Sequence, residues 1–170
     1  MREIYTGIDN GSTGSIAVIS DLFAGMIQTP VKKELSYTKK VQYVTRIDVV
    51  QLQEFFLEQM VAHNSDPEHV HIALERPMVN PKMFKASMSA MRAYEATINV
   101  FELMGLGYDT VDSKGFQKAL LPTGIKGSAE LKKASAQIGK RLYPHLSDII
   151  DKQKDGDSIC IAHWLMMKYK

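Results

Sequence analysis

The chain has 170 residues, of which 45% are hydrophobic, with a formal net charge of +2 and a single cysteine. This length and apolar content predict one folded domain over residues 1–170. A lone cysteine excludes a disulfide framework and a cysteine-based zinc site, and no apolar run reaches the ~18 residues of a membrane span. The N-terminus leads into a strand without a signal peptide, so we expect a cytoplasmic protein with no membrane partner.

Residues 3–30 predict three short strands. The segments EIYTGID (3–9), GSIAVIS (14–20) and AGMIQTP (24–30) are rich in β-branched residues and are separated by glycine-containing turns. The short turns favour an antiparallel arrangement. The polar segment that follows, KKELSYTKKVQYVTR (32–46), is expected to be a loop.

A helix and a fourth strand come next. Residues 47–64 place apolar side chains at helical spacing, and Asp48 stands where it would cap the helix N-terminus. The segment HVHIALE (69–75) predicts a strand that is stopped by Pro77. Because a helix separates this strand from the first three, we expect it to lie parallel to one of them through a right-handed crossover.

The second half of the chain is predicted to be mostly helical. We expect a long helix over 84–105, a fifth strand over 107–112, and helices over 113–122, 128–144 and 156–170. The long helix has an apolar stripe and a face of small residues, and we expect both to pack in the core, with a close dimer contact as the alternative. The stripe is Phe84, Met88, Met91, Tyr94, Ile98 and Phe101, and the small residues are Ala86, Ala90, Ala93 and Thr97. The order of elements predicts an α/β fold with a five-stranded mixed sheet, antiparallel and then parallel, flanked by helices.

Four carboxylates fall at the ends of predicted elements. Asp9 ends the first strand, Glu75 ends the fourth, and Asp155 and Asp157 stand at the start of the last helix. If the first and fourth strands are parallel neighbours, Asp9 and Glu75 share a sheet edge, and the last helix can bring its first turn there. Taken singly, each acid has a local explanation as a turn residue, an ion pair, a helix cap or a helix-dipole partner. Their convergence favours one shared site.

A cluster of carboxylates is unfavourable unless cations join it. Ligand sets made only of oxygen suit Mg²⁺ or Mn²⁺. Two such ions ~3.5–4 Å apart support the in-line attack of water on a phosphodiester. We therefore interpret the four acids as metal ligands, with two metal ions in the site.

Basic residues are concentrated in one part of the sequence. Residues 114–141 contain seven lysines and arginines but only one acid, Glu130. Such segregation suits a face turned toward a polyanion, although a solvated helix face would account for any single cluster equally well. The expected contacts to DNA phosphates are Lys114, Lys118, Lys126, Lys132 and Lys133.

Three motifs occur in a fixed order: GIDNGSTGSIAVI, ALERP and DGDSICIAHW. Together they resemble RuvC-type Holliday-junction resolvases of the RNase H-like superfamily, and residues 112–144 are similar to the basic segment of the phage branch of that family. The resemblance covers essentially the whole chain. It implies an RNase H-like fold, a homodimer with two active sites, and metal-dependent nicking of four-way DNA junctions in recombination and repair. A phage-encoded protein would act in the host cytoplasm.

The resemblance also assigns roles to individual residues. It makes Asp9, Glu75 and Asp157 catalytic metal ligands. Family members carry a fourth acid three positions before the last Asp, where this sequence has Lys154. Either Asp155 takes that role, as an outer ligand or helix cap that contributes less than Asp157, or the site keeps three acids. The family places a wedge residue shortly after the Glu, and the candidates for contact with the junction are Met78, Met83 and Phe84.

Three other functions share parts of this pattern. Sugar kinases and actin-like ATPases begin with a similar strand, Asp-x-Gly-Ser/Thr turn and strand, but they clamp the nucleotide between two such domains. A non-catalytic junction-binding protein would keep the fold and lose a core acid, whereas Asp9, Glu75 and Asp157 are all present. A general RNase H-like or flap-cutting nuclease is the nearest enzymatic alternative. Y-shaped and replication-fork DNA are possible substrates beside four-way junctions.

Overall fold

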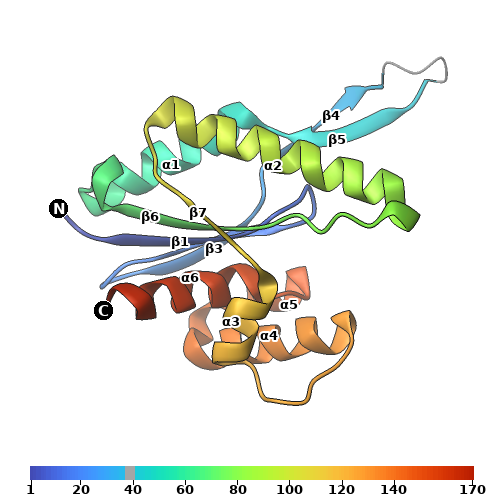
Figure 1. Ribbon diagram of the computed structural model, residues 1–170. Coiled ribbons are helices and arrows are strands. Elements are labelled where there is room, and N and C mark those ends of the chain that lie inside the picture. Colours follow the sequence, from blue (N-terminus) through green and yellow to red (C-terminus); the bar gives the residue numbers. More distant parts are fainter. Residues whose placement is uncertain (37–40) are drawn as a thin grey trace.

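The core of the molecule is a five-stranded sheet with the strand order β3-β2-β1-β6-β7 (Figure 1). The computed structural model describes residues 1–36 and 41–170. β1 pairs antiparallel with β2, which pairs antiparallel with β3, while β1–β6 and β6–β7 are parallel. The strands are β1 (Ile4–Asp9), β2 (Ser15–Ile19), β3 (Ala24–Gln28), β6 (Val70–Glu75) and β7 (Asp109–Val111). The predicted mixed sheet and the parallel placement of the fourth expected strand are confirmed.

Helices cover both faces of the sheet. α1 (Val49–His63) and α2 (Phe84–Met104) lie on one face, and α6 (Asp157–Tyr169) lies on the other (Figure 1). Beyond α6 are α3 (Ser113–Leu120), α4 (Ser128–Leu142) and α5 (Ser147–Gln153), and short 3-10 turns span Pro67–His69, Pro81–Met83 and Pro144–Leu146. Within the described residues, no helix is long and apolar enough to cross a bilayer.

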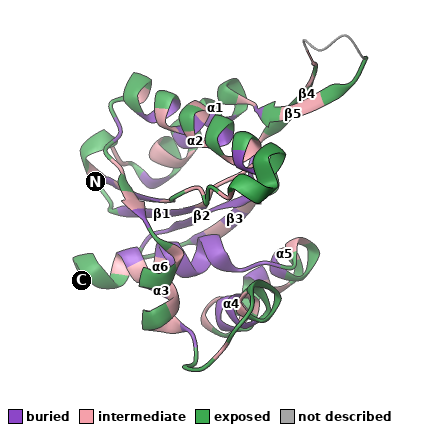
Figure 2. Cartoon of the chain, turned by 45° about the vertical axis from the view of Figure 1, so that its right-hand side comes forward, coloured by how far each residue is buried: buried purple, intermediate pink, exposed green. Residues whose placement is uncertain are grey.

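Side chains of the central strands alternate between two hydrophobic cores, as the two-residue period of a strand requires. In β2, Ile16 and Val18 join the core under α1 and α2, while Ala17 and Ile19 join the core around α6. Figure 2 shows the buried residues concentrated in these strands and in α6. A strand buried on both faces explains why the second expected strand is almost uniformly apolar.

The predicted helix cap at Asp48 is present. Its side chain accepts a hydrogen bond from the backbone N–H of Gln51 at 3.2 Å, at the start of α1. The capped N–H is one of the four that an α-helix leaves unpaired at its N-terminus. This cap marks the start of α1, the helix in the connection that leads to β6.

The loop predicted over residues 32–46 is wrong for most of its length. β4 (Val31–Leu35) and β5 (Tyr43–Ile47) form a separate antiparallel hairpin that projects from the body (Figure 1); residues 37–40 of the predicted loop lie outside the described residues. The two strands are mostly exposed and joined by an ion pair between Glu34 and Arg46. These strands are linked by a cross-strand charge pair and have no continuous apolar face. The sequence therefore lacks the alternating hydrophobic pattern that predicts a strand.

The expectation that both faces of the long helix pack in the core holds only for its second half. There Ala93 and Thr97 of the small-residue face are buried, and Phe101 of the apolar stripe is buried with them. Phe84, Met88 and Met91 from the apolar stripe are exposed. A surface of large apolar side chains is thus left on the first half of α2, where Figure 2 also shows exposed helix.

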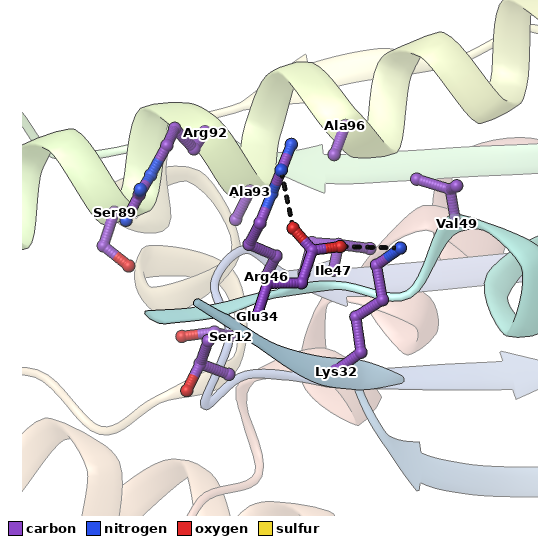
Figure 3. A pocket seen from close by; sticks show the side chains of 11 residues that line it. Ser12, Lys32, Glu34, Arg46, Ile47, Val49, Ser89, Arg92, Ala93 and Ala96 are labelled. Atoms are coloured by element: carbon purple, nitrogen blue, oxygen red, sulfur yellow. Dashed lines mark hydrogen bonds and ion pairs between the residues drawn. The ribbon is translucent and has the colours of Figure 1, made fainter. Parts of the chain in front are cut away.

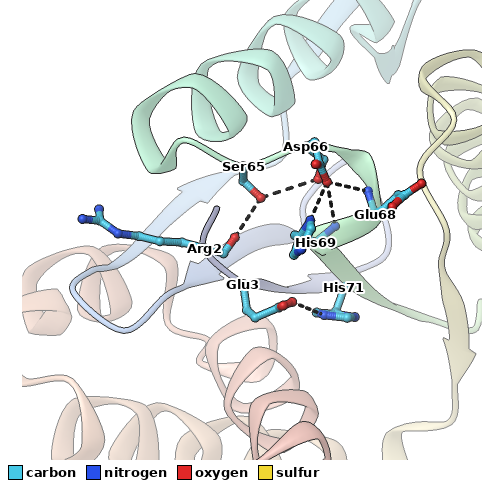
Figure 4. Close-up of polar contacts among 7 residues, drawn as sticks. All are labelled: Arg2, Glu3, Ser65, Asp66, Glu68, His69 and His71. Carbon is cyan, nitrogen blue, oxygen red and sulfur yellow. Dashed lines mark hydrogen bonds and ion pairs between the residues drawn. The ribbon is translucent and has the colours of Figure 1, made fainter.

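The start of the parallel strands carries two histidine–acid pairs (Figure 4). His71 Nε2 lies 2.6 Å from Glu3 Oε2, and His69 Nδ1 lies 2.6 Å from Asp66 Oδ1. The hydrogen bond to Asp66 raises the pKa of His69. These groups lie at the opposite end of the strands from Asp9, so they belong to a different edge of the sheet from the four acids.

Candidate active site

Asp9 and Glu75 lie side by side at one edge of the central sheet. The parallel register pairs Ile8 with Leu74, so the next residue of each strand is one of the two acids. Their side chains share a hydrogen bond, and Glu75 has a second one with Ser113 at the start of α3. Beyond Glu75, the N–H of Arg76 still bonds to β7 before the chain turns away. The register thus brings together two carboxylates that are 66 positions apart in the numbering.

The third acid, Asp157, reaches this edge because α6 packs very closely on β1. A Cβ atom added at Gly7 would overlap the backbone of Ser158 and Ala162, so only glycine leaves room for the helix. Ser15 Oγ at the start of β2 donates a hydrogen bond to Ser158 Oγ at 2.7 Å. Asp157 is the first residue of α6 and is buried. The close approach at Gly7 therefore sets the depth of Asp157 relative to Asp9.

The fourth acid, Asp155, is buried in the loop just before α6. Its Oδ1 accepts the backbone N–H of Asp157 at 2.8 Å, and its Oδ2 accepts a hydrogen bond from Lys132 Nζ at 2.5 Å. Gly156 lies between Asp155 and Asp157, and its φ of −123° is one that any residue adopts. Its role is spatial, because a Cβ there would meet the backbone of Ser135 in α4.

Burial and neighbouring charges raise the pKa values of three of the acids, Asp9, Glu75 and Asp157. Burial, followed by the charges of Glu75 and Asp155, raises the pKa of Asp9 well above its usual range. Burial also raises the pKa of Glu75, against its hydrogen bonds. Burial and then the charge of Asp155 raise the pKa of Asp157 to about 7. For Lys132, burial alone would lower the pKa, but its hydrogen bond and charge interaction with Asp155 raise it.

The residues of this cluster suit a divalent cation. Oδ1 of Asp157 is buried without a hydrogen-bond partner in the described part of the chain, and such an atom is expensive unless a ligand meets it. All four side chains offer oxygen, which matches Mg²⁺ and Mn²⁺. Within residues 1–36 and 41–170, no three candidate ligands are already arranged around one point.

The side chains predicted to contact DNA are found in different settings. Lys132 is in contact with Asp155 and so belongs to the acidic cluster. The others on α3, α4 and the loop between them are exposed: Lys114, Lys118, Lys126 and Lys133. Met78 and Met83 line a groove of about 320 Å³ together with Glu75, while Phe84 is exposed at the start of α2 and does not line it.

Three polar residues around the acids were not foreseen. Ser113 bonds to Glu75, Ser135 bonds to Asp157, and Asn10 Nδ2 donates to the backbone carbonyl of Ala90 in α2 at 3.2 Å. In the sequence they look like ordinary turn and helix residues. Only the position of Ser113, directly after the short strand that neighbours Glu75, carried a signal that could have identified it.

Comparisons with known proteins identify the fold. No family model and no curated protein match the chain. Among solved structures, Thermus thermophilus RuvC in complex with a Holliday junction substrate is 14% identical, with a TM-score of 0.55 over 98% of this chain and 96% of that chain. A second Thermus thermophilus RuvC structure is 15% identical, with a TM-score of 0.47 over 95% of this chain and 92% of that one. The five-stranded mixed sheet flanked by helices is therefore the RuvC-type, RNase H-like fold.

Proposed function

We propose that this protein is a metal-dependent endonuclease that nicks four-way and related branched DNA, as a RuvC-type resolvase of the phage branch. One observation carries the proposal. Four carboxylates, at the ends of β1 and β6 and at and just before the start of α6, interact through their charges, in a fold matched by a RuvC that was solved on a Holliday junction substrate. The phage branch rests only on the resemblance of residues 112–144.

The acids would hold the metal ions, and the cluster favours this over a nucleotide-phosphate turn. Asp9, Glu75 and Asp157 would be the main ligands of two Mg²⁺ or Mn²⁺ ions, with Asp155 an outer ligand. Bound metal would activate water and neutralise the charge that develops on the phosphodiester. A phosphate placed at Asp9 without metal would meet the neighbouring carboxylates directly. The tight turn alone, which sugar kinases and actin-like ATPases also have, is therefore the weaker indication of function.

The surroundings of the acids suit a DNA substrate. Exposed lysines on α3 and α4 flank the cluster, because Ser113 of α3 and Lys132 of α4 touch it directly. Positive side chains of this kind contact backbone phosphates irrespective of sequence. We assign Lys114, Lys118, Lys126 and Lys133 to that role, and Lys132 to a position between the acids and the DNA.

The exposed apolar residues near the site are assigned to the dimer and the junction. Met78 is 80% exposed and Phe84 is 68% exposed, and Met83, Met88 and Met91 are also exposed along the same part of the chain. Apolar side chains that gather on a surface mark interaction sites. We propose that the first half of α2 contacts a second copy of the chain, and that Met78, Met83 or Phe84 inserts at the branch point. Two sites in a homodimer would then cut opposed strands.

The decisive experiment is a nicking assay on a synthetic four-way junction, a Y-shaped fork and a linear duplex, with Mg²⁺ and with chelator. We expect paired nicks in the junction that require metal, weaker cleavage of the fork and none of the duplex. Asp9→Asn should bind the junction and leave it uncut. Junction binding without cleavage by wild type would identify a non-catalytic junction-binding protein. Equal cutting of all three substrates would identify a general RNase H-like nuclease.

A further inference from the structure

A second hollow has three cations, Lys32, Arg46 and Arg92, among its lining residues. It has a volume of about 110 Å³ and is enclosed between the β4–β5 hairpin and α2 (Figure 3). Lys32 and Arg46 line it from the hairpin, Arg92 and Ser89 line it from α2, and Ser12 comes from the β1–β2 turn. None of these residues belongs to the basic segment 114–141.

The charges in this hollow are unbalanced. Glu34 accepts a hydrogen bond from Arg46 at 2.8 Å and lies 3.0 Å from Lys32 Nζ. Arg92 has no ion-pair partner among the residues that the structure describes. Three cations against one carboxylate leave two positive charges, accompanied by the hydroxyl groups of Ser12 and Ser89. Figure 3 shows Glu34 between Arg46 and Lys32, with Arg92 directed toward Ser89. Cations and hydroxyls that line one hollow suit a phosphate group.

The position of the hollow relative to the acids follows from one contact. Asn10, which directly follows Asp9, is bonded to the backbone of Ala90. The cationic hollow contains Ser12 and Ser89, while the groove that contains Glu75 also contains Asn10 and Ala90. The two hollows therefore lie on either side of the Asn10–Ala90 contact, and a strand that passes Glu75 along α2 continues to Arg92.

We propose that this hollow binds a backbone phosphate of the DNA strand that leaves the active site on the hairpin side, and that Glu34 occupies the phosphate's place in the free protein. The inference rests on the proposed DNA substrate and adds to it a subsite outside the basic segment. When DNA binds, a phosphate takes over Arg46 and Lys32 from Glu34 and also engages Arg92. The β4–β5 hairpin is thereby a DNA-binding arm.

The test measures binding of a labelled four-way junction and a linear duplex, in chelator, between 50 and 200 mM salt. The variants are Arg92→Gln, Arg46→Gln and Glu34→Gln. Arg2→Gln is the matched control, since Arg2 precedes β1 at the opposite sheet edge from Asp9. Thermal unfolding of each variant checks that it is folded.

Loss of one phosphate contact lowers the slope of log K for DNA binding against log salt by ~0.9. The fourfold rise in salt should therefore weaken DNA binding by Arg92→Gln about 3.5-fold less than it weakens binding by wild type. We expect this for Arg92→Gln and Arg46→Gln and no change for Arg2→Gln. Glu34→Gln should bind more tightly than wild type and with a steeper slope, because its cations no longer face an internal anion. A purely structural ion pair would make Glu34→Gln bind no better than wild type.

Two results overturn the subsite: salt slopes of Arg92→Gln and Arg46→Gln that equal those of wild type, or a Glu34→Gln variant that binds DNA no more tightly than wild type. The proposed function fails in a different way, when wild type neither prefers the junction nor cuts it. In that case the salt slopes measured with the linear duplex still test whether the hollow binds a phosphate. A wild-type protein that binds no DNA overturns both.

Discussion

Lys132 Nζ lies 2.5 Å from a carboxylate oxygen of Asp155, which makes this lysine the one cation in contact with the acidic cluster among the described residues. Its charge lowers the pKa values of Asp9 and Asp157, although burial and the neighbouring acids outweigh it. Lys133, the next residue, is exposed and has no such contact. Variants of these two adjacent lysines can therefore separate an effect on the pKa values of the acids from contact with DNA phosphates.

Lys132→Gln should shift the acidic limb of the pH–cleavage profile to higher pH. Without the ammonium group the pKa of Asp157, already about 7, rises further, and protons compete with metal over a wider range. Lys133→Gln should leave the profile in place and lower the salt slope of junction binding by ~0.9. Cleavage rates from pH 6 to 9 and binding at several salt concentrations check both. Identical pH profiles for the two variants would show that Lys132 does not influence the pKa of Asp157 more than Lys133 does.

The metal-free protein should lose stability as pH rises from about 4 to about 7. Asp157 has a folded-state pKa of about 7 against 3.8 for an unperturbed group, so the folded chain binds more protons across that window and the free energy of unfolding falls with pH. The loss is of the order of a few kcal/mol. Urea unfolding in chelator measures it, and Asp157→Asn should flatten the slope. Adding Mg²⁺ at pH 7.5 should stabilise wild type more than Asp157→Asn.

Asp157→Asn and Asp155→Asn should differ in whether added Mg²⁺ restores cleavage. Asp157 is fixed by α6 and has an oxygen without a partner, whereas both oxygens of Asp155 are already engaged. We expect Asp157→Asn to be inactive at every Mg²⁺ concentration and Asp155→Asn to be partly rescued at high Mg²⁺. Single-turnover cleavage of a four-way junction across a Mg²⁺ titration decides it. The reverse result would make Asp155 the essential acid.

Gly7→Ala should destabilise the protein and impair the site together. The added methyl group meets the backbone of α6, which cannot rotate away, so we expect a loss of about 3 kcal/mol, the upper end for overpacking. Gly107→Ala is the control, because a Cβ there has open space and the residue lacks a positive φ. The free energy of unfolding in urea and the rate of junction cleavage should both fall for Gly7→Ala and stay unchanged for Gly107→Ala. Equal stability of the two variants would show that α6 can shift without cost.

The sheet and the meeting of its acids could be predicted because both follow from strand direction. Once HVHIALE is taken as parallel to the first strand, Asp9 and Glu75 must be neighbours. The β4–β5 hairpin could not be predicted from hydrophobic alternation, because its strands are mostly exposed and linked across by charge. α5 was missed for a similar reason, since its seven residues place only Ile150 fully in the core.

Contacts between distant side chains were beyond the reach of sequence patterns. Lys132 was expected at the DNA surface, because nothing in residues 128–142 indicates that this lysine, and not Lys133, turns toward Asp155. The spatial role of Gly156 could not be predicted either, because its neighbour in space, Ser135, is 21 positions away in the numbering. In both cases the deciding fact is the packing of α4 against the start of α6.

The Ser15–Ser158 hydrogen bond joins residues 143 positions apart, and this separation has a consequence during synthesis. Chains emerge from the ribosome N-terminus first, so Asp9 and Glu75 are made long before α6 exists. A nascent or truncated chain that ends before residue 157 lacks the acids that complete the cluster. We therefore expect any chemistry that requires Asp157 to begin only after α6 has been synthesised.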